Sequence, residues 1–250
     1  MNTSSVREII KRERRRRAFG LDSMCDWDFA HDNGENPQGT RYARNFTDLL
    51  DNFRKRGAGL LFFGSSGAGK SFAAAEIVNE LTDKGYNCLF TSFLTIISDL
   101  RTLNFDAQRS YLNQIFEKDL VVFDDLGSEG DTNRNNELIM QFVNNCRRRN
   151  IPMIFTTPFT VETLKKSSSG PRLLALSRIC QLCSPVTLYE PGTRRRQNRS
   201  EKATADALLK GAEIADQQSF AEFTEPETEP QETTVTECLP DTVQQTLLLK

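Results

Sequence analysis

The sequence predicts an α/β fold in which helices cover both faces of a parallel five-stranded sheet. Two observations support this prediction. Short apolar runs alternate with amphipathic helical patterns between Phe46 and Tyr189, and strands that alternate with helices form parallel sheets. Two of these runs also end directly in residues suited to ligand chemistry, and ligands bind such sheets beyond the carboxyl ends of the strands.

The expected elements follow the chain in order. Residues 1–20 predict a basic helix or an unstructured arm, and residues 21–40 an extended linker that carries Trp27 and Phe29. Continuous apolar runs of strand length are typical of strands buried on both faces, and apolar residues three or four apart are typical of helices. Strands are therefore expected at 60–63, 87–91, 120–123, 151–156 and 185–189. Helices are expected at 43–53, 72–81, 93–103, 107–116, 137–149 and 161–165.

Composition divides the 250 residues into three parts. Residues 1–40 form a basic arm and linker, 41–202 the folded domain, and 203–250 an acidic segment whose low apolar content predicts disorder. The formal net charge of −2 conceals this separation of charge. The basic start suits an acidic partner such as nucleic acid, although a solvated terminus explains it equally well.

Neither a membrane span nor a signal segment is evident, so we expect a cytoplasmic protein. Its six cysteines are then expected to be reduced. Cys180 and Cys183 form a C-x-x-C pair, but the single histidine, His31, is distant in sequence. Two core thiols at the end of a helix are a better interpretation of this pair than a metal site.

Eight residues after the first strand fit the phosphate-binding pattern G-x-x-x-x-G-K-[ST]. The strand before them and the helix after them argue against a chance glycine-rich turn. Backbone amides of such a loop surround phosphate oxygens; Lys70 is expected to reach the terminal phosphates, and Ser71 to ligate Mg²⁺. The predicted ATP-binding residues are Gly64, Ser65, Ser66, Gly67, Ala68, Gly69, Lys70 and Ser71.

Asp124 and Asp125 end the apolar strand at 120–123, about fifty residues after the phosphate loop. An acid at this point can support Mg²⁺, and its neighbour can orient an attacking water. A turn-forming Asp-Asp pair is the alternative, which the phosphate loop upstream makes less attractive. The combination predicts an ATPase that uses ATP and Mg²⁺.

From Leu60 to Arg196 the chain resembles the AAA+ ATPases of the DnaC-type replicative helicase loaders, with the IstB-type transposition ATPases as close relatives. Five stretches carry the resemblance: the phosphate loop, Val121–Gly127, Ile151–Thr157, Ser177–Ile179 and Arg194–Arg196. The resemblance implies an AAA+ sheet, and the short stretch after Tyr189 leaves room for little or no carboxyl-terminal lid.

The resemblance also implies residue roles. Asp124 would support Mg²⁺, and Asp125 would orient water. Arg178 matches an arginine finger that acts on ATP in a neighbouring subunit. Arg194 is similar to a sensor arginine that contacts the γ-phosphate, although the arginine cluster suits nucleic-acid phosphates as well. The family reads Thr-Thr-Asn where this chain has Pro158, so Thr157 must substitute for the sensing asparagine, or hydrolysis is weakened.

These features predict a DNA-binding hydrolase that acts in DNA replication. It would help load a replicative DNA helicase onto single-stranded DNA, assemble as a homo-oligomer, and engage the helicase through its basic amino-terminal region. Three alternatives stay open: an IstB-like transposition helper, a P-loop small-molecule kinase, and a nucleotide-gated binding module that scarcely turns over. The candidate DNA contacts are Lys84, Arg101 and Arg109, with Phe93 or Phe105 as stacking surfaces, and Arg147–Arg149 as a rival group.

Overall fold

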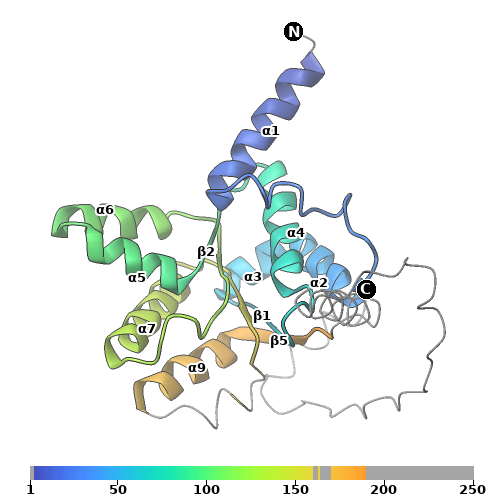
Figure 1. Cartoon of the computed structure of the whole chain (residues 1–250). Helices are drawn as coiled ribbons and strands as arrows, with labels where there is room; N and C mark the ends of the chain where they lie inside the picture. Colours follow the sequence, from blue (N-terminus) through green and yellow to red (C-terminus); the bar gives the residue numbers. More distant parts are fainter. Residues whose placement is uncertain (1–2, 160–162, 164–169, 190–250) are drawn as a thin grey trace, which may run out of the picture. The chain divides into compact units, whose positions relative to one another are not determined.

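The computed structural model describes residues 3–159, 163 and 170–189 of the chain (Figure 1). The strands are β1 (Gly59–Phe63), β2 (Cys88–Thr91), β3 (Leu120–Phe123), β4 (Met153–Thr157) and β5 (Cys183–Thr187). The helices are α1 (Thr3–Phe19), α2 (Pro37–Asp48), α3 (Leu50–Arg56), α4 (Lys70–Asp83), α5 (Phe93–Thr102), α6 (Phe105–Ile115), α7 (Asn133–Arg148) and α9 (Gly170–Leu182).

The five strands form one sheet in the order β2-β3-β4-β1-β5, and every neighbouring pair is parallel. The predicted α/β architecture is therefore confirmed. The last strand begins two residues before its predicted start, because Pro185 lies inside β5 rather than at its beginning. Among the strands that the structure describes, β5 pairs only with β1, and an edge strand tolerates a proline because one of its sides needs no ladder hydrogen bond.

Alternate residues of the strands pack into two separate hydrophobic clusters. Leu60 and Phe62 of β1 lie in the cluster with α2 and α4, whereas Leu61 and Phe63 lie in the cluster with α7 and α9. Figure 1 shows α2 and α4 on one side of the sheet and α5, α7 and α9 on the other. Both faces of the sheet are thus covered, which explains why β1 and β3 are buried along their whole length and carry no polar side chain.

The helix expected at 43–53 consists of two helices. α2 begins earlier, at Pro37, because the Asn36 side chain accepts from the Gly39 amide and caps the helix, and proline suits the first turn. The chain departs from helical geometry at Leu49, and α3 then ends at Arg56, before Gly57, whose φ of +52° is the left-handed value that glycine favours.

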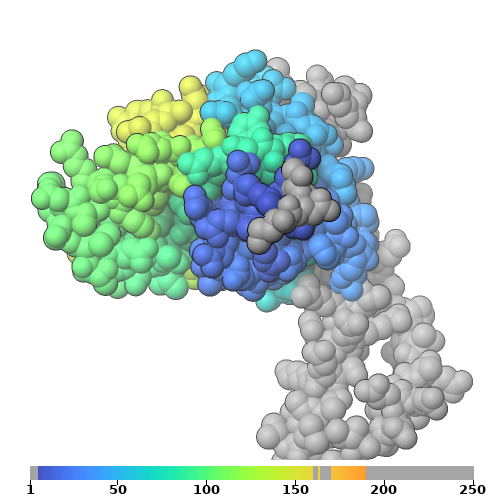
Figure 2. All heavy atoms as spheres, turned by 90° about the horizontal axis from the view of Figure 1, so that it is seen from above, coloured from blue at the N-terminus to red at the C-terminus, as the bar shows by residue number. Residues whose placement is uncertain are grey.

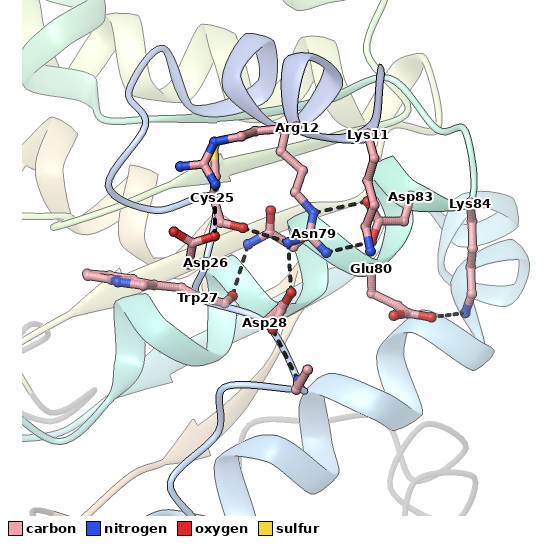
Figure 3. Close-up of polar contacts among 12 residues, drawn as sticks. Lys11, Arg12, Cys25, Asp26, Trp27, Asp28, Asn79, Glu80, Asp83 and Lys84 are labelled. Carbon is pink, nitrogen blue, oxygen red and sulfur yellow. Dashed lines mark hydrogen bonds and ion pairs between the residues drawn. The ribbon is translucent and has the colours of Figure 1, made fainter. Parts of the chain in front are cut away.

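The basic start of the chain is a helix, and its carboxyl-terminal half is anchored to the domain. Arg15 of α1 is buried; its guanidinium donates to both carboxylate oxygens of Asp83 on α4, at 3.0 and 2.6 Å, and to Asp28 at 2.7 Å. Burial opposes the charge of Arg15, but these bonds raise its pKa; despite burial, His31 and Arg15 lower the pKa of Asp28 to about 2. Figure 3 shows Asp28 and Asp83 within this network.

The segment between α1 and α2 lies along α4. The Asn79 amide of α4 donates to the carbonyls of Met24 and Trp27, at 2.9 and 3.0 Å, and the Trp27 ring lies 5.9 Å from that of Phe72. Seen from above, the dark-blue amino-terminal segment packs against the following segments in teal and light blue (Figure 2). The predicted linker therefore covers the helix that follows the phosphate loop.

Cys180 of α9 and Cys183 of β5 are buried in the cluster that covers the α7 side of the sheet. Burial, together with the neighbouring thiols Cys180 and Cys146, raises the pKa of Cys183 well above its usual value. The pair thus occupies the core, as the sequence predicted. Within the described part of the chain, no helix combines the length and the apolar character that a membrane crossing requires.

Candidate ATP-binding site

The predicted phosphate loop connects β1 to α4, with its glycines in conformations that side chains disfavour. Gly64 has a φ of +151°, and a Cβ atom there would lie only 2.0 Å from the carbonyl oxygen of Leu188. Gly69 has a φ of +84° and precedes the first residue of α4. Glycine at these positions lets the loop pass close to Leu188, just after β5, and lead into the amino-terminal end of α4, which favours phosphate.

Lys70 begins α4 with its ammonium group directed into the loop. Its Nζ donates to the carbonyl oxygens of Gly64 and Ser65, at 2.9 and 2.7 Å. Burial lowers the pKa of Lys70, while the nearby charges of Asp125 and Asp124 raise it. The cation is therefore held where the terminal phosphates of a bound nucleotide would provide better partners than two carbonyls.

The first aspartate of the pair lies directly beside the phosphate loop. Oδ1 of Asp124, which follows β3, accepts from the Ser71 hydroxyl at 2.9 Å and from the Thr156 hydroxyl at 2.6 Å. Burial raises the pKa of Asp124, and these two hydrogen bonds lower it. A serine hydroxyl and a carboxylate are oxygen donors of the kind that Mg²⁺ prefers, so the residues present fit this ion.

Asp125 differs from Asp124 in both conformation and exposure. Its φ is +59°, a left-handed value that few residues other than glycine adopt, and its side chain is exposed. Its amide donates to the Thr156 hydroxyl at 2.9 Å, and the next amide, of Leu126, donates to the Thr156 carbonyl at 2.8 Å. The turn thus aims the second carboxylate away from the strand, toward solvent at the edge of the site.

Thr156 is a site residue that the sequence analysis missed. Alternation along β4 could have identified it, because Thr156 shares its face with Ile154, which packs on the α4 side, whereas Thr157 shares the other face with Phe155. The fully buried Thr157 hydroxyl donates to the Leu126 carbonyl at 2.9 Å and accepts from the Phe159 amide at 3.3 Å. Its catalytic role stays a prediction.

Asn36 ties the segment before α2 to the phosphate loop. Its Nδ2 donates to the Ala68 carbonyl at 2.7 Å and makes a longer contact of 3.5 Å to the Tyr189 carbonyl, while its Oδ1 caps α2. One side chain therefore joins three segments around the loop. The sequence did not predict this contact, because it joins residues that are far apart in the chain.

The loop after Asp125 is braced by buried charges. The Glu129 carboxylate accepts from the Gly127 amide at 2.8 Å, and its other oxygen lies 3.8 Å from Nη1 of Arg172 in α9. Asp131 lies 3.7 Å from the same nitrogen. Sequence reasoning had no signal for this pairing, because it joins residues of a loop and a distant helix.

The remaining predicted residues lie apart from the phosphate loop or outside the described residues. Arg178, on α9, donates to Gln181 of the same helix at 3.2 Å, and Leu174, one turn earlier, is exposed. The role of Arg178 as an arginine finger stays a prediction. Arg194, like the predicted helix at 161–165 except Thr163, lies outside the described residues.

Comparisons with known proteins support the fold and an ATP-binding family. The IstB-like ATP binding protein family matches residues 10–201. The replicative helicase loader DnaI of Bacillus subtilis (strain 168) is 26% identical over 166 residues, which cover 61% of this chain and 53% of that protein. An insertion sequence ATP-binding protein of Sinorhizobium fredii (strain NBRC 101917 / NGR234) is 26% identical over 152 residues, or 60% and 50% of the two chains.

The chain therefore spans about half the length of the curated relatives it matches. Among solved structures, the crystal structure of DnaI covers 67% of this chain and 94% of its own, with a TM-score of 0.55 at 19% identity, which shows the fold. The expected P-loop fold of the AAA+ type and the expected resemblance are both confirmed. Since the family match extends over most of the described residues, the chain belongs to the IstB-like ATP binding protein family.

Proposed function

We propose that this protein is an AAA+ ATPase that helps load a replicative DNA helicase onto single-stranded DNA in the cytoplasm. The observation that carries the proposal is the convergence of Ser71 and Asp124 beside Lys70, with the exposed Asp125 next to them. This set has the parts that ATP hydrolysis requires. The similarity to a helicase loader supports the choice of partner.

The residues of the site have separate tasks in this proposal. Amides of the phosphate loop and the Lys70 ammonium bind and orient the phosphates. Ser71 and Asp124 would hold Mg²⁺, which when bound neutralises charge on the phosphate oxygens. Asp125 orients the attacking water, and Thr156 fixes the position of Asp124 by donating to it. Glu129 holds the turn after Asp125 through the Gly127 amide.

Single-stranded DNA would bind on α5 and α6. In Figure 1 these helices project from one side of the sheet, and in Figure 2 the green segments that include them lie at one edge of the view. Phe105 begins α6 with 79% of its surface exposed, and Arg101 and Arg109 are near it in sequence. An exposed ring between cations suits base stacking with phosphate contact.

Two other expected DNA contacts are less suited to the role. The prediction of Phe93 as a stacking surface is wrong, because its side chain is 1% exposed. Its ring stacks on that of Phe123 in the core, with 4.4 Å between the ring centroids. Lys84 is exposed, but its ammonium pairs with Glu80 at 3.1 Å. The stacking role therefore falls to Phe105.

The helicase would dock on the amino-terminal half of α1. Three exposed apolar residues, Val6, Ile9 and Ile10, lie on this half of the helix, which extends from the domain (Figure 1). Arg7 and Arg14 are exposed beside them. The Arg15 network holds the other half of the helix in place, so that the docking half has a fixed base.

Hydrolysis would depend on assembly into a homo-oligomer. Arg178 would act on ATP held by a neighbouring copy, and Arg194 would contact the γ-phosphate within its own subunit. A finger supplied in trans raises turnover by about 10³–10⁵ in well-studied NTPases. Low protein concentration should then leave ATP bound and turnover slow.

A second candidate is an ATPase that assists transposition. The matched family and the relative from Sinorhizobium fredii favour it. It uses the same ATP site and differs in its partner, which would be a transposase. A transposase gene beside the coding gene would favour this candidate over the helicase loader.

The test is a loading assay with purified ring helicase from the native host and circular single-stranded DNA. The parent protein with ATP should place helicase on the circle, and Lys70→Ala should not. A protein that hydrolyses ATP yet never binds or loads the helicase refutes the loader assignment. In that case the same preparation should be tested for binding to the transposase.

A further inference from the structure

Two basic triads end two helices at the same edge of the sheet. Arg54, Lys55 and Arg56 form the last turn of α3, and Arg147, Arg148 and Arg149 end α7. The strands that follow these helices are neighbours, since Gly59 at the start of β1 pairs with Met153 at the start of β4. A Cβ atom at Gly57 would lie 3.0 Å from the Arg147 carbonyl and 3.1 Å from its guanidinium, so the residue that directly follows the first triad lies against the second.

A seventh cation extends this edge toward β3. Lys118 precedes β3, and Arg54 of α3 reaches the adjacent Asp119 at 3.0 Å. We call these seven residues the basic edge: Arg54, Lys55, Arg56, Lys118, Arg147, Arg148 and Arg149. All seven residues precede the beginnings of strands, whereas the ATP-binding loop follows the end of β1. The basic edge therefore lies at the amino ends of the parallel strands, and the ATP site lies at their carboxyl ends.

Most of this positive charge is not neutralised. In the described part of the chain, only Arg54 of the basic edge pairs with a carboxylate. Lys118 and Arg148 donate to the side chains of Asn87 and Asn145, and Arg149 lies over the Phe116 ring at 5.4 Å. These partners are neutral and leave the charges available to an anion.

The preference of helix carboxyl ends for cations does not explain all seven residues of the basic edge. The carboxyl end of a helix favours a cation, with an effect confined to its last turn. Two adjoining triads and Lys118 place far more charge at one edge than two helix ends require, and the nearby acids Asp51, Glu117 and Asp119 are fewer. Five of the seven are arginines, whose planar groups bind phosphate through two hydrogen bonds.

We propose that the basic edge binds the phosphate backbone of nucleic acid. This surface is separate from the Phe105 surface on α5 and α6, and its contacts would need neither ATP nor a helicase. A DNA strand bound on the α5–α6 surface could then make a second contact with the protein at the basic edge, far from the ATP site. Such contacts read charge rather than base sequence, so binding should be insensitive to sequence.

The test compares salt dependence in two double variants of the full chain. Arg56→Gln/Arg148→Gln removes two cations from the basic edge, and Arg41→Gln/Arg134→Gln removes two exposed cations elsewhere. Binding of a labelled single strand and of the matching duplex is measured by fluorescence anisotropy without nucleotide. In the edge variant, the slope of log affinity against log salt should fall by about 1.4 on the single strand and about 1.8 on the duplex.

Further variants separate charge from structure. Arg56→Lys/Arg148→Lys should retain the parent slope, because it keeps both charges. ATP turnover without DNA should be unchanged in the edge variant, since neither residue contacts the ATP site. A loss of turnover would count against the proposed ATPase site and not against nucleic-acid binding at the basic edge. Parent-like slopes on both probes for a folded Arg56→Gln/Arg148→Gln protein would overturn the proposal, as would an equal fall in the control variant.

Discussion

Replacing Thr156 with valine tests the arrangement around Asp124 most closely. Valine keeps the shape of threonine and removes the hydroxyl that donates to Asp124 at 2.6 Å and accepts from the Asp125 amide at 2.9 Å. A hydrogen bond to a charged group contributes about 1.5–3 kcal/mol, so the free energy of unfolding should fall by about 2 kcal/mol. Ser71 then remains as the partner of Asp124.

The same change should alter how the site responds to pH. The Thr156 hydrogen bond lowers the pKa of Asp124 against the effect of burial, so its loss should raise that pKa further. Mg²⁺ needs the deprotonated carboxylate, and therefore Mg²⁺-dependent ATP binding should begin at a higher pH in Thr156→Val. Urea denaturation and ATP titrations across a pH series measure the two effects.

Two controls make this reasoning refutable. Thr156→Ser keeps the hydroxyl and should behave like the parent. Thr157→Val removes the hydroxyl that bonds the Leu126 carbonyl and should leave the pH profile of Mg²⁺ binding unchanged. A Thr156→Val protein with the parent's stability and pH profile would show that this hydroxyl does not support Asp124.

Three further predictions concern, in turn, how stability depends on pH, what limits ATP turnover, and whether turnover needs contact between subunits. Burial raises the pKa of Glu76 to about 8, with Asp32 and Asp28 adding to the effect and Arg44 opposing it. Stability from this group is complete below its unfolded pKa of about 4.3 and declines as pH rises to 8, by up to about 1.4 kcal/mol per pH unit; Glu76→Gln should flatten that decline in urea denaturation. Pro158→Asn should raise ATP turnover if a missing sensor limits it, and no gain in a folded, ATP-bound variant would assign that role elsewhere. Arg178→Ala and Lys70→Ala should each be nearly inactive and recover part of the turnover when mixed, whereas no recovery despite co-assembly on DNA contradicts a finger in trans.

The sequence predicted most of the fold because its signals are local. Apolar runs identified β1 to β4 to within two residues, and the phosphate-loop pattern placed a helix directly after the loop, although α4 begins at Lys70, two residues before its predicted start. The break between α2 and α3 at Leu49 was missed because apolar spacing continues across it and only the backbone turns. The earlier start of β5 was missed because Pro185 resembles a boundary, although an edge strand accepts it.

The candidate site was predictable where chemistry is written in a motif and not where it depends on packing. Motif spacing predicted Ser71 and Asp124 as site residues, and in the structure the Ser71 hydroxyl donates to Oδ1 of Asp124 at 2.9 Å. Thr156 acts through the face of the strand it occupies, and Glu129 through a contact with α9. Arg15 was assigned to a basic arm, but burial and two carboxylates make it an anchor.

ATP binding and ATP turnover, measured side by side for the parent, Lys70→Ala and Asp125→Asn, test the central claim most directly. Lys70→Ala should lose ATP affinity, because it removes the cation held inside the phosphate loop. Asp125→Asn should bind ATP as the parent does but hydrolyse it far more slowly, because only the exposed carboxylate is changed. Unchanged affinity in Lys70→Ala, or parent turnover in Asp125→Asn, would contradict the assignment of an ATP-hydrolysing site to these residues.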